Sequence, residues 1–251
     1  MKKASGMPWR GRAYLHKKYP WAFPLSESQL EVLDGLARNG PINPYKLGKS
    51  IRKAYSFVFN TLRELELRKM VTFLREKTEK GVYAKIYDLA LEGVMLVLHR
   101  EMNKGAREKK NLSFIRKIIE KYSHMLPLVF GKWRYFEKAG CAEMVLTRLK
   151  IIVDTHESNP FKKGTGFYPW LEMEQQITRF FFFFDTFKPD HQRIIDSDYN
   201  AWMTALRQDK EIKSYVIQEL KYEQKRLKNV QIQVEKSILF MEPHPSVELP
   251  Q

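Results

Sequence analysis

The stretch AYSFVFNTLRELELRKMVTF, Ala54–Phe73, begins with the period of an amphipathic helix and ends in residues that favour β-strands. Val58, Leu62 and Leu65 are spaced four and three residues apart, which places them on one face of a helix. The polar side chains of the stretch, among them an asparagine and an arginine, then lie on the opposite face. The change of composition predicts that the helix ends shortly before Val71 and that a strand follows.

Two helix starts precede this stretch. Ser26 stands three residues before Gln29, which is the spacing of a capping box, and the helix that it predicts stops at Asn39-Gly40-Pro41. Asn43 followed by Pro44 combines an N-cap residue with a proline suited to the first helical turn, so a short helix is predicted over YKLGKSI. The helix of the opening stretch is therefore the third of three.

A β-hairpin is predicted after the third helix. The β-rich segments Val71–Arg75 and Val82–Leu89 flank a charged turn that ends at Gly81. A further helix is predicted through LALEGVMLVLHREM, where apolar residues recur at helical spacing, and it ends at Asn103-Lys104-Gly105. Ala90 cannot cap the first turn of that helix with its side chain, and Asp88 is a candidate to substitute for it.

This order of elements is typical of a winged helix-turn-helix domain. From Leu25 to about Met102 the sequence resembles the DNA-binding domain of MarR-type and PadR-type regulators, which are common in archaea and bacteria. The recognition-helix pattern V-x-x-x-L-x-x-L-E appears as VFNTLRELE, and the strand-to-helix junction Y-x-L-T-x-x-G appears as YDLALEG. The sequence departs from the family pattern at Ala90, where threonine or serine is usual, and at Lys69, where glycine commonly follows the recognition helix.

The resemblance implies a mainly α fold with a small β-hairpin wing. We expect three parts: a basic aromatic arm over residues 1–25, a winged helix-turn-helix DNA-binding domain over 26–105, and a helical dimerisation or effector domain over 106–251. Winged-helix regulators usually bind two half-sites as dimers, so the expected partners are double-stranded DNA and a second copy of the chain.

The net charge also favours a polyanionic partner. Lysine and arginine number 44 against 29 acidic residues, a net charge of +15. Counted from the sequence, residues 1–105 hold 20 basic and 10 acidic residues, and residues 106–251 hold 24 and 19. Nucleic acid fits this excess better than an anionic membrane surface does.

Base reading is assigned to the polar side of the third helix, which presents Ser56, Phe57, Phe59, Asn60 and Arg63. In a major groove, Asn60 can form a bidentate contact with adenine, and Arg63 can contact guanine or a phosphate. Phe57 or Phe59 can pack on a thymine methyl group. Alternatively, the two phenylalanines are core or interface residues, and the two polar side chains are ordinary solvated surface.

Phosphate contacts are assigned to the cations just before this helix, Lys49, Arg52 and Lys53. Such contacts supply affinity and not sequence preference. The wing turn REKTEKG adds Arg75, Lys77 and Lys80, with glutamates between them. Its tip either reaches a neighbouring minor groove or the DNA backbone, or is a solvated hairpin turn.

The arm contains three prolines and shows no helical or strand period. It either contacts phosphates or the minor groove, or is a solvated tail that docks Trp21 and Phe23 on the first domain. The cations that would make the contacts are Arg10, Arg12, Lys17 and Lys18.

Residues 107–245 read as almost entirely helical. The segment from Asp209 to about Met241 carries an apolar stripe that suggests coiled-coil-like packing, either in a dimer or within the same chain. The stripe includes Ile212, Val216, Leu220, Leu227 and Val234. The dense aromatic residues of this half are a core, or they line a pocket for an apolar effector.

The sequence also indicates the cellular compartment of the protein and the kinds of site that we expect it to lack. Cys141 is the one cysteine, so an intramolecular disulfide is excluded, and its apolar neighbours indicate a buried small residue. No apolar run is long enough for a membrane span, and the first residues lack the apolar stretch of a secretory signal, which predicts a cytoplasmic protein. No HExxH, CxxC, GxGxxG, P-loop or GxSxG motif occurs, so we expect no enzyme, cofactor or metal.

The sequence therefore predicts a transcriptional regulator that reads duplex DNA through a winged helix-turn-helix, as a dimer. The alternative is a winged-helix module that binds a protein, RNA or a single strand in replication, repair or transcription machinery.

Overall fold

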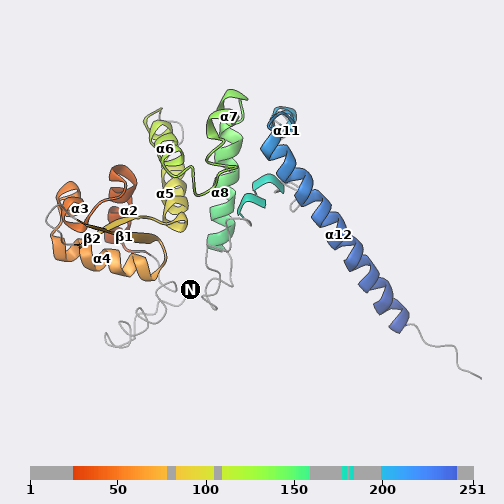
Figure 1. Ribbon diagram of the computed structural model, residues 1–251, viewed down its shortest axis with the longest axis horizontal. Coiled ribbons are helices and arrows are strands. Elements are labelled where there is room, and N and C mark those ends of the chain that lie inside the picture. Colours follow the sequence, from red (N-terminus) through yellow and green to blue (C-terminus); the bar gives the residue numbers. More distant parts are fainter. Residues whose placement is uncertain are drawn as a thin grey trace, which may run out of the picture. The chain divides into compact units, whose positions relative to one another are not determined.

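The computed structural model describes residues 25–77, 83–104, 109–158, 177–179, 181–183 and 199–241. The chain divides into two compact units, residues 1–198 and 199–251. The first unit contains the three helices, the hairpin and the helix predicted for a winged helix-turn-helix (Figure 1). In chain order these elements are α2 (Glu27–Asn39), α3 (Pro44–Ile51), α4 (Tyr55–Leu67), β1 (Val71–Lys77), β2 (Tyr83–Leu89) and α5 (Leu91–Asn103).

The predicted starts of α2 and α3 are confirmed in atomic detail. The Ser26 hydroxyl accepts a hydrogen bond from the Gln29 amide at 3.3 Å, and the Gln29 side chain accepts one from the Ser26 amide at 3.0 Å. Asn43 accepts from the Lys46 amide at 2.8 Å, and Pro44 is the first residue of α3. Both helices therefore begin where their side chains satisfy amides that would otherwise lack partners.

The hydrophobic core lies between the three helices and the stem of the hairpin. Val58, Leu62 and Leu65 of α4 are fully buried, as the sequence predicts, together with Leu33 of α2 and Leu47 of α3. This burial stabilises α4 through one face and leaves its other face to solvent.

The hairpin is joined to the helix-turn-helix by backbone hydrogen bonds. The strands pair antiparallel, from Val71 opposite Leu89 outward. The Ile42 amide donates to the Tyr87 carbonyl at 3.0 Å, and the Tyr87 amide donates to the Ile42 carbonyl at 2.9 Å. The segment between α2 and α3 thus extends the sheet by one bridge, and the orientation of the hairpin stem is fixed.

Two backbone positions shape the junctions of the hairpin. Lys69, which follows α4, has φ 58°, in the left-handed region where glycine is favoured. This explains why glycine is the usual residue here in the family that the sequence resembles. Gly93 lies so close to the preceding loop that an added Cβ would meet the Met70 carbonyl oxygen at 2.2 Å.

The prediction that Asp88 substitutes as the cap of α5 is wrong. Ala90 occupies the N-cap position without a side-chain hydrogen bond, and the Asp88 carboxylate instead accepts from the Leu89 amide at 2.8 Å and from the Tyr122 hydroxyl at 2.7 Å. As a residue of β2, Asp88 turns its side chain toward the segment after α6. Burial raises the pKa of Tyr122 above its ordinary value, and the hydrogen bond to Asp88 acts in the same direction.

Helix α6 (Lys109–Lys121) packs back onto the winged helix. The Lys121 ammonium donates to the Ala37 carbonyl at the end of α2, at 3.1 Å. The Arg38 guanidinium lies 5.9 Å from the centre of the Phe114 ring. Helix α6 is thus in direct contact with the helices before it.

The rest of the first unit is built around an aromatic core. Its helices are α7 (Trp133–Lys138) and α8 (Ala142–Ser158). Trp133, Phe136, Phe181 and Phe182 are buried, so the prediction that these aromatics form a core is confirmed for them, and Cys141 is buried as predicted.

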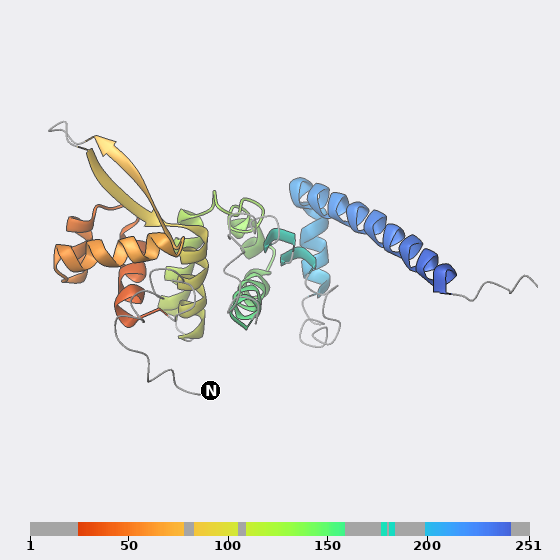
Figure 2. The same ribbon diagram turned by 90° about the horizontal axis from the view of Figure 1, so that it is seen from below.

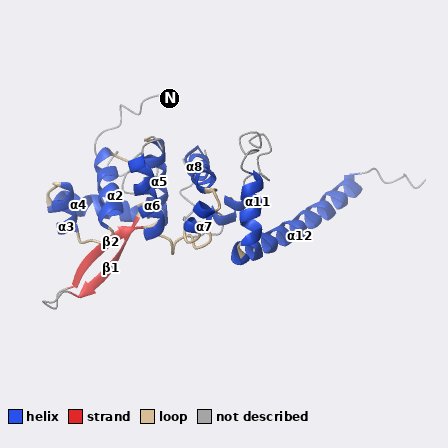
Figure 3. Cartoon of the chain, turned by 90° about the horizontal axis from the view of Figure 1, so that it is seen from above, coloured by secondary structure: helices blue, strands red, loops and turns tan. Residues whose placement is uncertain are grey.

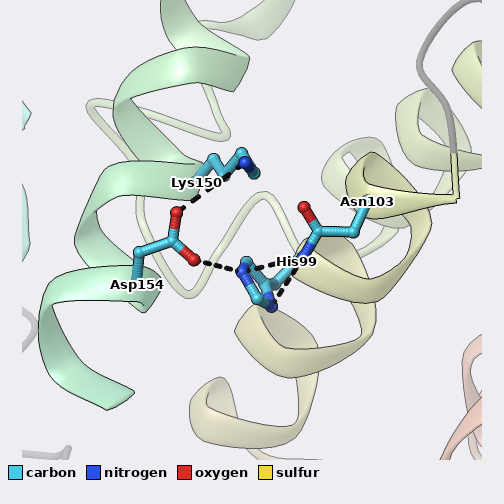
Figure 4. A network of polar contacts seen from close by, with 4 residues as sticks. All are labelled: His99, Asn103, Lys150 and Asp154. Carbon is cyan, nitrogen blue, oxygen red and sulfur yellow. Dashed lines mark hydrogen bonds and ion pairs between the residues drawn. The ribbon is translucent and has the colours of Figure 1, made fainter. Parts of the chain in front are cut away.

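A polar network links α5 to α8 (Figure 4). The nearly buried ring of His99 lies with Nε2 2.6 Å from a carboxylate oxygen of Asp154, and the Asn103 amide nitrogen lies 3.1 Å from the same ring nitrogen. Lys150 contacts the second oxygen of Asp154 at 3.8 Å. The last helix of the winged helix is thus bonded to α8 by side chains as well as by packing.

The second unit consists of α11 (Tyr199–Gln208) and α12 (Lys210–Met241), shown as helices in Figure 3. These two helices pack together, and Trp202, Leu206 and Ile212 are buried. No helix in the described ranges is long and apolar enough to cross a membrane.

Replacing Gly93 by alanine tests the close approach of α5 to Met70. The added Cβ forces a backbone shift, so we expect Gly93→Ala to lower the free energy of unfolding by at least about 2 kcal/mol in urea denaturation. Gly140→Ala is the matched control, because Gly140 has φ 75° but open space around it, and we expect it to cost about 1 kcal/mol. Equal losses for the two variants would contradict the steric assignment.

Replacing Tyr122 by phenylalanine tests the bond to Asp88. The carboxylate loses a donor, and we expect a loss of about 1.5 kcal/mol at neutral pH. In the wild type, the unfolded tyrosine releases its proton near pH 10, the ordinary value, while the folded one retains it. Stability should therefore fall above pH 10 more steeply in the wild type than in Tyr122→Phe. Parallel pH profiles would show that Tyr122 is not buried against Asp88.

Candidate nucleic-acid interface

The exposed face of α4 presents the polar residues that the sequence singled out. Ser56, Asn60 and Arg63 are exposed at spacings of four and three residues, opposite the buried apolar face. Leu67 continues this row and is 61% exposed. Phe57 lies at the flank of the row, half-buried, with the Lys53 ammonium 5.7 Å from its ring centre. The structure therefore brings Ser56, Asn60 and Arg63 together and sets Phe57 apart from them.

A hydrogen bond to α2 holds α4 in place. The Gln29 side chain, which is 4% exposed, donates from Nε2 to the Glu64 carboxylate at 2.7 Å. The same side chain completes the capping box of α2 through its oxygen. Arg68, at the end of α4, is also buried; burial lowers its pKa, and Glu64 and Glu92 oppose this shift. The orientation of α4 is thus set by polar contacts as well as by the core.

The predicted phosphate-contacting residues line the approach to α4. Lys49, Arg52 and Lys53 are all exposed, and Lys53 forms an ion pair with Glu31 at 3.0 Å. The Lys49 ammonium lies 4.5 Å from the ring centre of Tyr45, an exposed residue of α3 that the sequence analysis missed. A single aromatic residue on a short helix shows no periodicity that could have identified it.

A pair of aromatic residues lies at the start of α4. The rings of Tyr55 and Phe59 are stacked, with centres 5.8 Å apart and planes 20° apart. The Arg63 guanidinium lies 6.0 Å from the centre of Phe59. Phe59 is half-buried and Tyr55 is 52% exposed, so the outer edge of this stack is open to solvent.

Of the predicted wing cations, Arg75 is exposed on β1. The side chain of Lys77 and the whole of Lys80 lie outside the described residues, as do Arg10, Arg12, Lys17 and Lys18 of the arm. The structure adds Lys85 of β2, whose ammonium lies 3.8 Å from the ring centre of Phe73 and 5.8 Å from that of Tyr87. Strand alternation could have placed Lys85 on the same face as these rings.

Tyr87 connects α4 with the hairpin. Its ring is buried and lies 5.7 Å from that of Phe73, centre to centre. Burial raises the pKa of its hydroxyl, the nearby Glu66 carboxylate acts in the same direction, and Arg63 opposes the shift. Glu66 and Arg63 of α4 therefore act electrostatically on the hydroxyl of a residue in the hairpin stem, and α4 also packs against β1.

Five cations of this surface lack, in the part of the chain that the structure describes, the ion pairs that several cations elsewhere in the first unit form. Within the described residues, no carboxylate forms an ion pair with Lys49, Arg52, Arg63, Arg75 or Lys85. On α6 and α7, by contrast, Arg116 pairs with Glu137, and Arg134 pairs with Glu120 at 2.9 Å. The positive charge of α3, α4 and the hairpin is therefore available to an external anion.

The residues of the predicted dimer stripe differ in exposure along α12. Leu220, Leu227 and Val234 are each at least half exposed. Ile212, in contrast, is fully buried in the single chain, which fits the alternative of packing within the same chain at this position. Val216 is half-buried between these two regions.

Comparisons with known proteins give two solved structures. A possible transcriptional regulator from Methanosarcina mazei Go1 is 17% identical, over 47% of this chain and 88% of its own, with a TM-score of 0.26. A MarR family transcription regulator is 12% identical, over 60% of this chain and 87% of its own, with a TM-score of 0.26. No protein-family model and no curated protein matches the chain. These similarities establish neither the family nor the activity of this protein.

Proposed function

We propose that the chain is a transcriptional regulator that reads duplex DNA with α4. The observation that supports this function best is the exposed polar face of α4, bordered on both sides by cations that lack carboxylate partners in the described residues. An α-helix fits the major groove of B-DNA, and such a face can read base edges there. A surface with unpaired cations gains affinity from a polyanion without first breaking ion pairs.

The residues of this surface divide into two roles. Asn60 and Arg63 project from the middle of the exposed face of α4 and would read bases through bidentate hydrogen bonds. Lys49 and Arg52 lie at the end of α3 and would contact phosphates, which position the protein without selecting a sequence. Lys53 is a weaker candidate for a phosphate contact, because Glu31 already neutralises its charge.

A second copy of the chain is the proposed partner of α12. Leu220, Leu227 and Val234 recur every seven residues, and Val230 lies between the last two, as in the a and d positions of a coiled coil. The exposed fractions of these side chains lie between 47% and 58%. Pairing of two such helices would bury the stripe and would place two winged helices in one particle, as binding to two half-sites requires.

Base reading is tested with duplexes selected by the wild type from a random-sequence pool. We expect Asn60→Ala and Arg63→Ala each to cost about 1–3 kcal/mol on the selected duplex and to relax its preference at particular positions. Lys49→Ala should weaken the selected and a scrambled duplex equally and make the salt dependence less steep. If all three variants lost affinity equally on both duplexes, the assignment of Asn60 and Arg63 to base reading would be wrong.

Dimerisation is tested by sedimentation equilibrium of the full chain. A charge in the stripe must be desolvated on pairing, so Leu227→Glu should convert a wild-type dimer into a monomer at micromolar concentration. Asn229→Glu is the matched control: it introduces the same charge at an exposed position outside the stripe and should remain dimeric. A monomeric wild type, or two variants with the same mass, would refute the dimer.

A further inference from the structure

One face of the hairpin carries aromatic residues and cations beyond the point where the core ends. Cross-strand partners along this face are Phe73 with Tyr87 and Arg75 with Lys85, and Tyr83 follows in the next row on the same side. We call Phe73, Arg75, Tyr83 and Lys85 the wing-stem face. Tyr87 is buried at its inner end, whereas the hairpin beyond projects away from the helices (Figure 2).

The cation pair of the wing-stem face is unfavourable in the isolated protein. Arg75 and Lys85 lie directly opposite each other, and like charges in this position destabilise a sheet. In the described part of the chain neither residue forms an ion pair, and Glu76 belongs to the other face of β1. The Lys85 ammonium is held 3.8 Å from the Phe73 ring centre, where the ring fixes its position. An anion bound between the two cations would remove their repulsion.

The aromatic residues specify which kind of anion fits. Tyr83 is 67% exposed, and Phe73 is half-buried on the opposite side of the cation pair. Cations alternating with exposed rings are the pattern of surfaces that hold single-stranded nucleic acid, because phosphates meet the cations and unpaired bases stack on the rings. A duplex offers the same phosphates, but its base faces are already stacked.

We propose that the wing-stem face binds an unpaired nucleotide segment, with a phosphate between Arg75 and Lys85 and a base stacked on Tyr83. This proposal rests on the proposed function in that both require a nucleic-acid partner. Beyond the proposed function, the ligand would include a single-stranded segment next to the duplex that α4 reads, such as an opened or overhanging end. Sequence preference at this face would be slight, because every base has a face that can stack.

The test is fluorescence anisotropy with the full chain and three probes: a blunt duplex, the same duplex with a short single-stranded thymidine extension, and the free single strand. One stacked base is expected to make the extended duplex bind at least about fivefold more tightly than the blunt one. Tyr83→Ala should abolish this gain and leave affinity for the blunt duplex within about twofold. Lys85→Ala removes a cation that duplex phosphates can also meet, so it should weaken the extended duplex more than the blunt one.

Matched controls separate the site from general effects. Tyr222→Ala removes another exposed tyrosine, from α12, and Lys117→Ala removes an exposed lysine from α6; both should retain the full gain. Far-ultraviolet circular dichroism confirms that each variant is folded. If phosphate displaced the extension selectively over chloride at matched ionic strength, and Tyr83→Ala kept the full gain, the site would be assigned to a free phosphate group and the proposal would be overturned.

Two further results would overturn the inference and leave the proposed function intact. The first is wild-type binding to the blunt duplex with no gain from the extension. The second is equal weakening of the blunt and extended duplexes by Tyr83→Ala and Lys85→Ala, which would make the wing-stem face an ordinary duplex contact. A wild type that binds none of the three probes would refute both proposals.

Discussion

The two backbone hydrogen bonds between Ile42 and Tyr87 are the constraint on which the candidate interface depends. They attach the hairpin to the segment that joins α2 and α3, so the sheet and the helix-turn-helix cannot rotate independently. Tyr87 then lies buried with its ring beside Phe73, and Arg63 of α4 acts electrostatically on its hydroxyl. The exposed residues of α4 and the wing-stem face keep a fixed spacing because both are built on this residue.

The electrostatics of that rigid surface determine which ligand it can bind. Some cations of the first unit are paired with carboxylates, as Arg100 is with both oxygens of Asp34. Lys49 of α3 and Lys85 of the hairpin are instead held beside the aromatic rings of Tyr45 and Phe73. An aromatic ring positions an ammonium group without neutralising it. The charge therefore remains available to a ligand, at the cost of repulsion such as that between Arg75 and Lys85.

Local signals in the sequence predicted most of the winged helix. Features that depend on tertiary contacts were not predicted. Ser26 with Gln29 and Asn43 with Pro44 act through neighbouring amides, so their spacing alone located the helix starts. Asp88 was misassigned because its partner, Tyr122, is 34 residues away. Ile212 was assigned to the dimer stripe because periodicity shows which residues share a face, but not which of them are buried within the chain. Tyr45 was missed because a single aromatic residue on a short helix shows no periodicity, whereas strand alternation could have placed Lys85 beside Tyr87.

The most direct test of the central claim is the affinity of the wild type for a duplex DNA pool across a salt series. Each phosphate that a cation neutralises contributes a slope of about −0.9 in a plot of log K against log salt concentration. The cations of α3, α4 and the hairpin predict measurable binding at low salt, with a slope of about −3 or steeper. Absence of binding at low salt, or a slope near zero, would contradict the account of this surface as a nucleic-acid interface.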